Sequence, residues 1–288
     1  MVWDGIVACD LFCAGLGAWT FIFAILPAKE GSQAHRAKLV GVLVAFSLVA
    51  LGALILAVDA RGGLLNPMRY FNLLGNLGSV MSWGVVLISL FLIGSLACAA
   101  LLLAKRTVPR ALELITAVIG VGVSLYTGVL LSTSPAFPLW NIAVLPIAFV
   151  VSAAYTGYAA YSLIERFSAP TGNLLPSWSV RVAFVLPVCE AMALVALLAV
   201  VSATQGSGAE AASASVDALV SGACALLFWG GTVAVGLIVP FALAVARNRI
   251  GHAAPAWAGV LEWACILVGG FAFRCAIVMA AVPIFACA

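Results

Sequence analysis

Four ionisable side chains lie inside long apolar runs of the sequence, where burying a charge is costly. They are Asp10, Glu190, Glu262 and Arg274. Glu190 and Arg274 are expected near the middle of their runs, at matching depth. A carboxylate beside a guanidinium can form an ion pair, and a buried carboxylate can also pass a proton. The sequence leaves both interpretations open, a structural ion pair or a proton route, for Glu190, Glu262 and Arg274.

Asp10 differs from these residues because it is expected only about two turns inside the end of its run. One interpretation is an acid that stays hydrated near the interface; the other is a group that lines an opening and exchanges protons there. Tyr126 is expected in the same layer, and a buried tyrosine hydroxyl needs a hydrogen-bond partner. A quinone carbonyl is one candidate partner. The flanking Cys9 and Cys13 are interpreted as packing residues.

The composition places these groups in a membrane. Hydrophobic residues make up 65% of the 288 residues and charged residues 8%, against about 45–50% and 25% in soluble domains. Apolar runs without strand-like alternation predict an all-α integral membrane domain. Its eight expected transmembrane helices cover residues 5–26, 38–58, 79–104, 112–132, 141–163, 181–203, 217–245 and 257–285.

The distribution of cations predicts the orientation. Ten of the 13 Lys and Arg residues fall in loops on one side of the predicted helices. The positive-inside rule makes these loops cytoplasmic and places both termini outside. We therefore expect a multi-pass protein of the cytoplasmic (inner) membrane, with no nucleic-acid partner.

Histidine and cysteine usage argues against bound redox metals. His35 and His252 both fall in predicted loops, so the paired ligands of an intramembrane haem are missing. The eight cysteines include no Cys-x-x-Cys pair and lie mostly in apolar runs, which predicts neither a metal site nor an iron–sulfur cluster on this chain. Electrons would have to be carried by a diffusible organic cofactor.

Several motifs together carry a family resemblance. They are DLFCAGLGAW at the first helix, the stretch from Asp59 to Phe91, the stretch YTGVLLSTSPAFPLWNIAVLPIAFVVSAAYTG from Tyr126 to Gly157, and GGFAFR near the C-terminus. The sequence resembles the NrfD-like family, the membrane subunits of polysulfide reductase and related molybdenum-enzyme complexes. It departs from the family pattern where a compact Asp-Leu-Gly-Arg-Pro is opened into residues 59–67.

The resemblance implies an architecture and partners. Eight helices would form two four-helix bundles, and a quinone, menaquinone or ubiquinone, would bind near the outer face. Electrons would pass between the quinone and a ferredoxin-like iron–sulfur subunit, which serves a molybdopterin catalytic subunit; both would dock on the extracytoplasmic face. The protein would thus be the quinone-interacting subunit of a respiratory oxidoreductase, without a complete catalytic site for the terminal substrate.

The resemblance also implies site residues. Asp10 falls where the family has a tyrosine or histidine near the quinone, Tyr126 matches the pocket tyrosine, and Asp59 matches the acid that ends the second helix. Quinol oxidation releases two protons, which Asp10 and Tyr126 would accept and Asp59 would pass to water. The remaining expected quinone contacts are Trp83, Trp140, Asn141 and Arg69, although both tryptophans also fit an aromatic belt at the membrane interface.

Two other functions stay open from the sequence. A secondary transporter would use Glu190 and Arg274 as coupling or substrate residues. A pure structural anchor would hold the soluble subunits while another protein handles quinone.

Overall fold

The fold is a bundle of long helices, seen in a computed structural model that describes residues 5–26, 31–59, 78–168, 179–250 and 255–286. Within these ranges the protein forms helices and no strands. Eight of the helices, counting η2 and α9 as one, are long and apolar enough to cross a membrane. The elements are α1 (Gly5–Ile25), α2 (Ser32–Asp59), α4 (Val80–Leu103), α5 (Arg110–Ser132), α6 (Leu145–Ser168), α7 (Ser179–Ser202), η1 (Gly206–Gly208), α8 (Ala209–Val220), η2 (Leu226–Ile238), α9 (Val239–Ile250), α10 (Ala256–Met279) and η4 (Ile284–Ala286).

Their composition explains why these segments are helical. Hydrocarbon offers no hydrogen-bond partner, so each spanning segment has to satisfy its backbone internally, as a helix does. Large apolar side chains such as Ile93 and Val118 are exposed on the outside of the bundle. In water that exposure would be costly, whereas lipid tails are as apolar as these side chains. The prediction of an all-helical membrane domain is confirmed.

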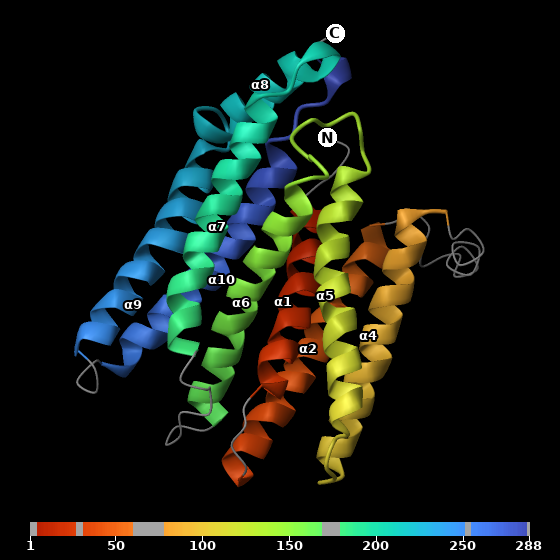
Figure 1. The fold of residues 1–288 in the computed structure, drawn as a ribbon, viewed down its shortest axis with the longest axis vertical. Coiled ribbons are helices and arrows are strands. Elements are labelled where there is room, and N and C mark those ends of the chain that lie inside the picture. Colours follow the sequence, from red (N-terminus) through yellow and green to blue (C-terminus); the bar gives the residue numbers. More distant parts are fainter. Residues whose placement is uncertain (1–4, 27–30, 60–77, 169–178, 251–254, 287–288) are drawn as a thin grey trace.

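Two groups of helices meet along α1, α6 and α10 (Figure 1). The first group contains α1, α2, α4 and α5; the second contains α6, α7, η2 with α9, and α10. α1 packs against α2 and α5 but also against α6 and α10, so it joins both groups. A division into two separate four-helix bundles remains a prediction.

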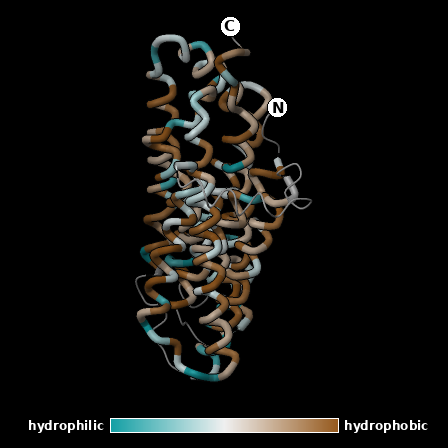
Figure 2. The backbone as a smooth tube through the Cα atoms, turned by 90° about the vertical axis from the view of Figure 1, so that its right-hand side faces the viewer, coloured by the Kyte–Doolittle hydropathy of each residue, from teal (hydrophilic) through white to brown (hydrophobic). Residues whose placement is uncertain are grey.

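The two ends of the bundle differ in charge. The α4–α5 connection and the end of α9 lie at the lower end in Figure 1, and they carry lysines and arginines. We call this end the basic face. The opposite face carries α8, the start of α1 and η4, so the described part of the protein begins and ends on the same side (Figure 1). Figure 2 shows hydrophilic residues at both ends and a mostly hydrophobic stretch between them.

Two helix boundaries differ from the sequence-based expectation. Residues 209–220, expected as part of a flexible linker and the start of a span, form the short helix α8, and the seventh span begins at Leu226. α10 ends at Met279 rather than at 285, because Pro283 follows and cannot continue a helix. The run of apolar residues therefore overstated the length of the last span.

The seventh span begins as a π-helix. In η2 the hydrogen bonds run from residue i to i−5, and the backbone N–H of Val239 bonds to the carbonyl of Ala234. Gly236 of η2 packs backbone to backbone against Gly269 of α10, where any β-carbon on Gly269 would stand 2.0 Å from the Gly236 Cα. Glycine pairs of this kind let membrane helices approach closely.

Candidate functional site

The carboxyl group of Asp10 is buried between α1 and α2. Asp10 is the sixth residue of α1, which begins at the opposite face of the bundle. Its side chain is only 4% exposed. A β-carbon on Gly52 of α2 would stand 3.0 Å from Asp10 Oδ1, so the carboxyl group lies directly against the backbone of α2. Asp10 is thus enclosed by helices rather than placed at the surface of the bundle.

Tyr126 of α5 is buried in the same layer. It lies six residues before the end of α5 and is 7% exposed, which places it about 9 Å from that helix end. Its ring covers Gly84 of α4, where a β-carbon would stand 1.9 Å from the Tyr126 Cζ. The tyrosine ring can lie here only because Gly84 has no side chain.

Asp10 and Tyr126 lie within electrostatic range of each other. A phenol hydroxyl can donate or accept a hydrogen bond, and a carboxyl group can accept or release a proton. Two such groups at one depth, near the opposite face, can bind the oxygen atoms of a small ligand. A phenol hydroxyl together with a carboxyl group suits a quinone or quinol, because each of the two oxygens of such a ligand needs a hydrogen-bond donor or acceptor.

Three other expected quinone contacts lie within the described residues, and their roles remain predictions. Trp83 is 54% exposed on the outside of α4, a position that suits an aromatic belt. Trp140 is buried, and its indole Nε1 donates to the carbonyl of Ile277 at 3.1 Å. The Asn141 Oδ1 accepts a hydrogen bond from the backbone of Ala143 at 2.9 Å, within the turn that precedes α6.

Two further expected site residues cannot be placed. Asp59 is the last residue of α2, as its expected role as a helix-ending acid requires, but its side chain is not among the described ones. Arg69 lies outside the described residues. The roles of both remain predictions.

Glu190 and Arg274 both lie near Ser152. Arg274 Nη1 donates to the Ser152 Oγ of α6 at 3.1 Å, and Glu190 of α7 lies within electrostatic range of both Ser152 and Arg274. Glu190 lies in the middle of α7, whereas Arg274 is five residues before the end of α10. Arg274 is therefore nearer the opposite face than the sequence suggested, since α10 ends earlier than expected.

Arg274 also contacts both helix groups where they meet. Its guanidinium donates to the carbonyls of Gly270 at 3.2 Å and Phe149 at 3.4 Å. It lies 5.2 Å from the ring centroid of Phe149 and 5.5 Å from that of Phe12 on α1. Cation–π contacts and carbonyl acceptors compensate part of the cost of burying this charge.

Glu262 has a different partner from the other two intramembrane charges. Its Oε2 forms an ion pair of 2.7 Å with Arg247 Nη1 of α9 near the basic face. The Arg247 guanidinium also lies 5.3 Å from the ring centroid of Trp263. Glu262 is therefore tied to the basic face rather than to Arg274.

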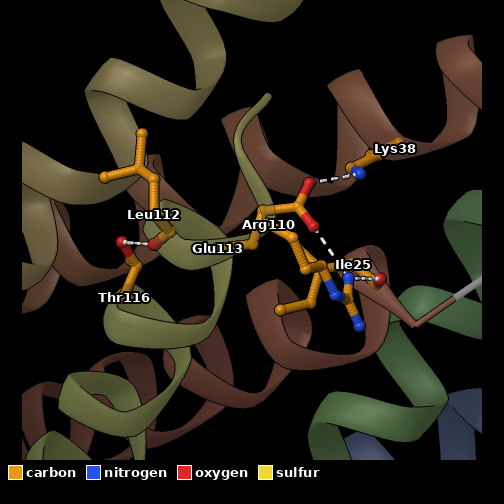
Figure 3. A network of polar contacts seen from close by, with 6 residues as sticks. All are labelled: Ile25, Lys38, Arg110, Leu112, Glu113 and Thr116. Carbon is orange, nitrogen blue, oxygen red and sulfur yellow. Dashed lines mark hydrogen bonds and ion pairs between the residues drawn. The ribbon is translucent and has the colours of Figure 1, made fainter. Parts of the chain in front are cut away.

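The basic face holds a network of charged side chains that was not predicted from the sequence (Figure 3). Glu113 of α5 is buried and forms ion pairs with Lys38 of α2 and with Arg110, the latter at 2.7 Å. Arg110 Nη1 also donates to the carbonyl of Ile25 at 2.9 Å, which caps the end of α1. The three-residue spacing of Arg110 and Glu113 was the available signal, whereas nothing in the sequence pointed to Lys38.

These features define a helical multi-pass membrane protein with several ionisable groups, among them Asp10, Glu190 and Arg274, buried between its helices. Within the described residues no group of three or more His, Cys, Asp or Glu side chains could hold a metal ion.

Comparison with known proteins gives the family. The family described as "Polysulphide reductase, NrfD" matches residues 1–286, and the protein belongs to it. It is 32% identical to the C subunit of polysulfide reductase from Wolinella succinogenes over 272 residues, which cover 85% of this protein and 84% of that relative. It is 30% identical to protein NrfD of Escherichia coli over 284 residues, 86% of each of the two. The protein is accordingly a membrane subunit of an oxidoreductase complex.

Proposed function

We propose that this protein binds quinone or quinol beside Asp10 and Tyr126 and exchanges electrons with a docked iron–sulfur subunit. The observation that carries the proposal is the burial of these two side chains in one layer near the opposite face, at 4% and 7% exposure. Membership in the polysulphide reductase family supports a redox role. The basic face would be cytoplasmic, and the protein would lie in the cytoplasmic membrane.

The two side chains would handle the protons of the reaction. Oxidation of one quinol breaks two O–H bonds and yields the quinone, two electrons and two protons. Tyr126 would orient the ligand through a hydrogen bond from its hydroxyl group, while Asp10 would accept a proton from the bound quinol. The electrons would leave toward an iron–sulfur subunit on the opposite face, and protons would pass through Asp59 to water on that face.

The partners follow from the same proposal. The relative from Wolinella succinogenes is named as the C subunit of polysulfide reductase, which indicates a complex with further subunits. For this protein we propose a ferredoxin-like iron–sulfur subunit and a molybdopterin catalytic subunit, docked on the extracytoplasmic face.

The test is quinol-dependent reduction of the iron–sulfur partner in the purified complex. Asp10→Asn and Tyr126→Phe should each lower the rate by about tenfold or more, because each removes one group that handles a proton or orients the ligand. Tyr161→Phe serves as the matched control, since it changes a buried tyrosine elsewhere.

Three outcomes would contradict the proposal. If both site variants keep the rate within about a factor of two, the proposed site is wrong. Absence of bound quinone in an active complex that recruits a second membrane protein would favour a pure anchor. Substrate uptake by the protein alone in liposomes would favour a transporter.

A further inference from the structure

The connection between α4 and α5 at the basic face carries several exposed cations. Lys105, Arg106 and Arg110 lie within six consecutive residues, and all three are exposed. The two helices that they join pack against each other, which puts the helix axes about 8–10 Å apart. The three charges therefore share one small area of the surface, which we call the α4–α5 basic patch.

The backbone of the α4–α5 basic patch is fixed by hydrogen bonds at the end of α4. The N–H of Lys105 donates to the carbonyl of Leu102 at 3.0 Å, and the N–H of Arg106 donates to that of Leu101 at 2.9 Å. Lys105 has a φ of 55°, a left-handed conformation in which helix ends usually have glycine. A β-carbon makes this conformation unfavourable. Strained residues of this kind cluster at binding sites, where their side chains are used.

Arg110 is held in place through only one of its nitrogen atoms. Its Nη1 donates to Glu113 Oε2 at 2.7 Å and to the carbonyl of Ile25 at 2.9 Å. A guanidinium has five N–H donors, and the Arg110 side chain is 57% exposed. Glu113, in contrast, is only 3% exposed. The arginine can therefore still bind an anion, whereas the acid that fixes it is kept away from the surface.

The charge of the basic face is uneven between the two helix groups. Among the described residues, the second helix group carries four cations and two acids at this face. The first helix group carries five cations and one acid there, namely Arg36, Lys38, Lys105, Arg106, Arg110 and Glu113. The positive-inside rule accounts for cations in all loops on one side. It does not account for their excess over one part of that side.

Apolar side chains continue from the α4–α5 basic patch into the membrane. On α5 the exposed residues Leu114, Val118 and Val121 follow Arg110 in steps of four, four and three residues, which places them on one side of the helix. From Arg110 to Val121 the helix rises about 16 Å, close to half of a hydrocarbon core of about 30 Å. Leu103, at the end of α4, is also exposed. The surface thus has cations at the level of lipid headgroups and an apolar stripe as long as one leaflet.

We propose that the α4–α5 basic patch binds an anionic phospholipid. The lipid phosphate accepts hydrogen bonds from Lys105, Arg106 and Arg110, and one acyl chain lies along the apolar stripe of α5. Arginine binds phosphate through two parallel N–H donors, and basic residues at the membrane surface attract anionic headgroups. The bound lipid connects the end of α4 with the start of α5. This site is separate from the proposed quinone site, which lies near the opposite face.

The experiment measures lipid binding by the purified full-length protein in detergent. The midpoint of thermal unfolding is followed while phosphatidylglycerol, phosphatidylcholine or soluble glycerol phosphate is added. A ligand that binds only the folded protein raises the midpoint. We expect phosphatidylglycerol to raise it by several degrees, phosphatidylcholine to raise it less, and glycerol phosphate, which lacks acyl chains, to leave it unchanged.

Variants of the exposed cations locate the site. Lys105→Gln and Arg106→Gln should each weaken the apparent affinity for phosphatidylglycerol by about fivefold, and the double variant by about 25-fold. Arg249→Gln is the matched control, because Arg249 is an exposed cation at the basic face of the second helix group. Arg110 is left unchanged, since its replacement would also disturb Glu113 and the end of α1.

Lys105→Gly separates lipid binding from a purely structural role. Glycine removes the charge and also relieves the left-handed backbone at this position. We expect a higher unfolding midpoint without lipid, together with an affinity for phosphatidylglycerol that is about fivefold weaker. A higher midpoint with unchanged lipid affinity would overturn the proposal.

Three other results would also overturn the lipid site. The first is equal stabilisation by phosphatidylglycerol and phosphatidylcholine. The second is stabilisation by glycerol phosphate alone that equals the effect of the lipid, because the ligand would then be a free phosphate. The third is an equal loss of affinity in Arg249→Gln and Arg106→Gln, which would mean a general attraction to the whole basic face.

Discussion

The ring of Tyr126 lies on the backbone of Gly84, so that a β-carbon at Gly84 would stand 1.9 Å from Cζ and 2.2 Å from the hydroxyl oxygen. Real β-carbons do not approach other atoms this closely, and the ring is held between α4 and α5. The position of the hydroxyl group thus depends on a residue that has no side chain. Gly84 therefore positions the ring of Tyr126.

Gly84→Ala should therefore displace the Tyr126 ring. We expect quinol-dependent reduction of the iron–sulfur partner to fall about tenfold, close to the loss in Tyr126→Phe, because the hydroxyl no longer reaches its place. Gly122→Ala on α5 is the control, since its β-carbon would meet only the flexible end of Leu87 at 3.3 Å. Normal activity in Gly84→Ala would show that the ring position is unimportant for turnover. The double variant with Tyr126→Phe should be no slower than either single one.

Glu113→Ala should destabilise the protein. The change removes the buried counter-charge of Lys38 and Arg110. Because the two cations are 27% and 57% exposed, water compensates part of the loss, and we expect about 1–2 kcal/mol. The midpoint of thermal unfolding in detergent is the measurement. Glu210→Ala on α8 is the control, because Glu210 is exposed and should change stability by less than about 0.5 kcal/mol. An equal midpoint for both variants would mean that the network in Figure 3 contributes nothing.

Arg274→Lys should also be destabilising although it keeps the charge. The guanidinium donates to Ser152, Gly270 and Phe149, and an ammonium group cannot reach the same acceptors with the same geometry. We expect a loss of about 2 kcal/mol in the free energy of unfolding, measured by denaturant titration in mixed micelles. Arg249→Lys, at an exposed position of α9, should be neutral. A neutral Arg274→Lys would mean that the charge alone, without the fork of donors, holds the junction.

Gly269→Ala should separate η2 from α10. The new methyl group would stand 2.0 Å from the Cα of Gly236, and a backbone atom cannot move aside as a flexible side chain can. Overpacking of this kind costs about 1–3 kcal/mol, and yield and thermal stability of the purified protein are the readouts. Gly230→Ala, in the same segment, would meet only Leu226 Cδ1 at 3.4 Å and should be tolerated. Equal stability of the two variants would show that η2 and α10 are not closely packed.

The helices and the family could be predicted from the sequence, because both depend on local composition and on the spacing of motifs. Long apolar runs predict helices in a membrane whatever they pack against, since the backbone has to be satisfied internally. The same runs located Asp10, Glu190, Glu262 and Arg274 as exceptional residues. Helix ends depend on more than composition, and α10 stops six residues before the expected end of its span at residue 285.

Which polar groups meet was decided by the tertiary structure alone. Spanning helices that are apolar on all sides give no stripe from which their inward face can be recognised. Ser152 between Glu190 and Arg274, Gly84 beneath Tyr126, and Lys38 beside Glu113 join residues between 38 and 122 positions apart in the sequence. Only the packing of helix on helix, such as α4 on α5 and α6 on α7 and α10, brings such groups together. The sequence determined that charges are buried in this membrane protein, and the fold determined which partners compensate them.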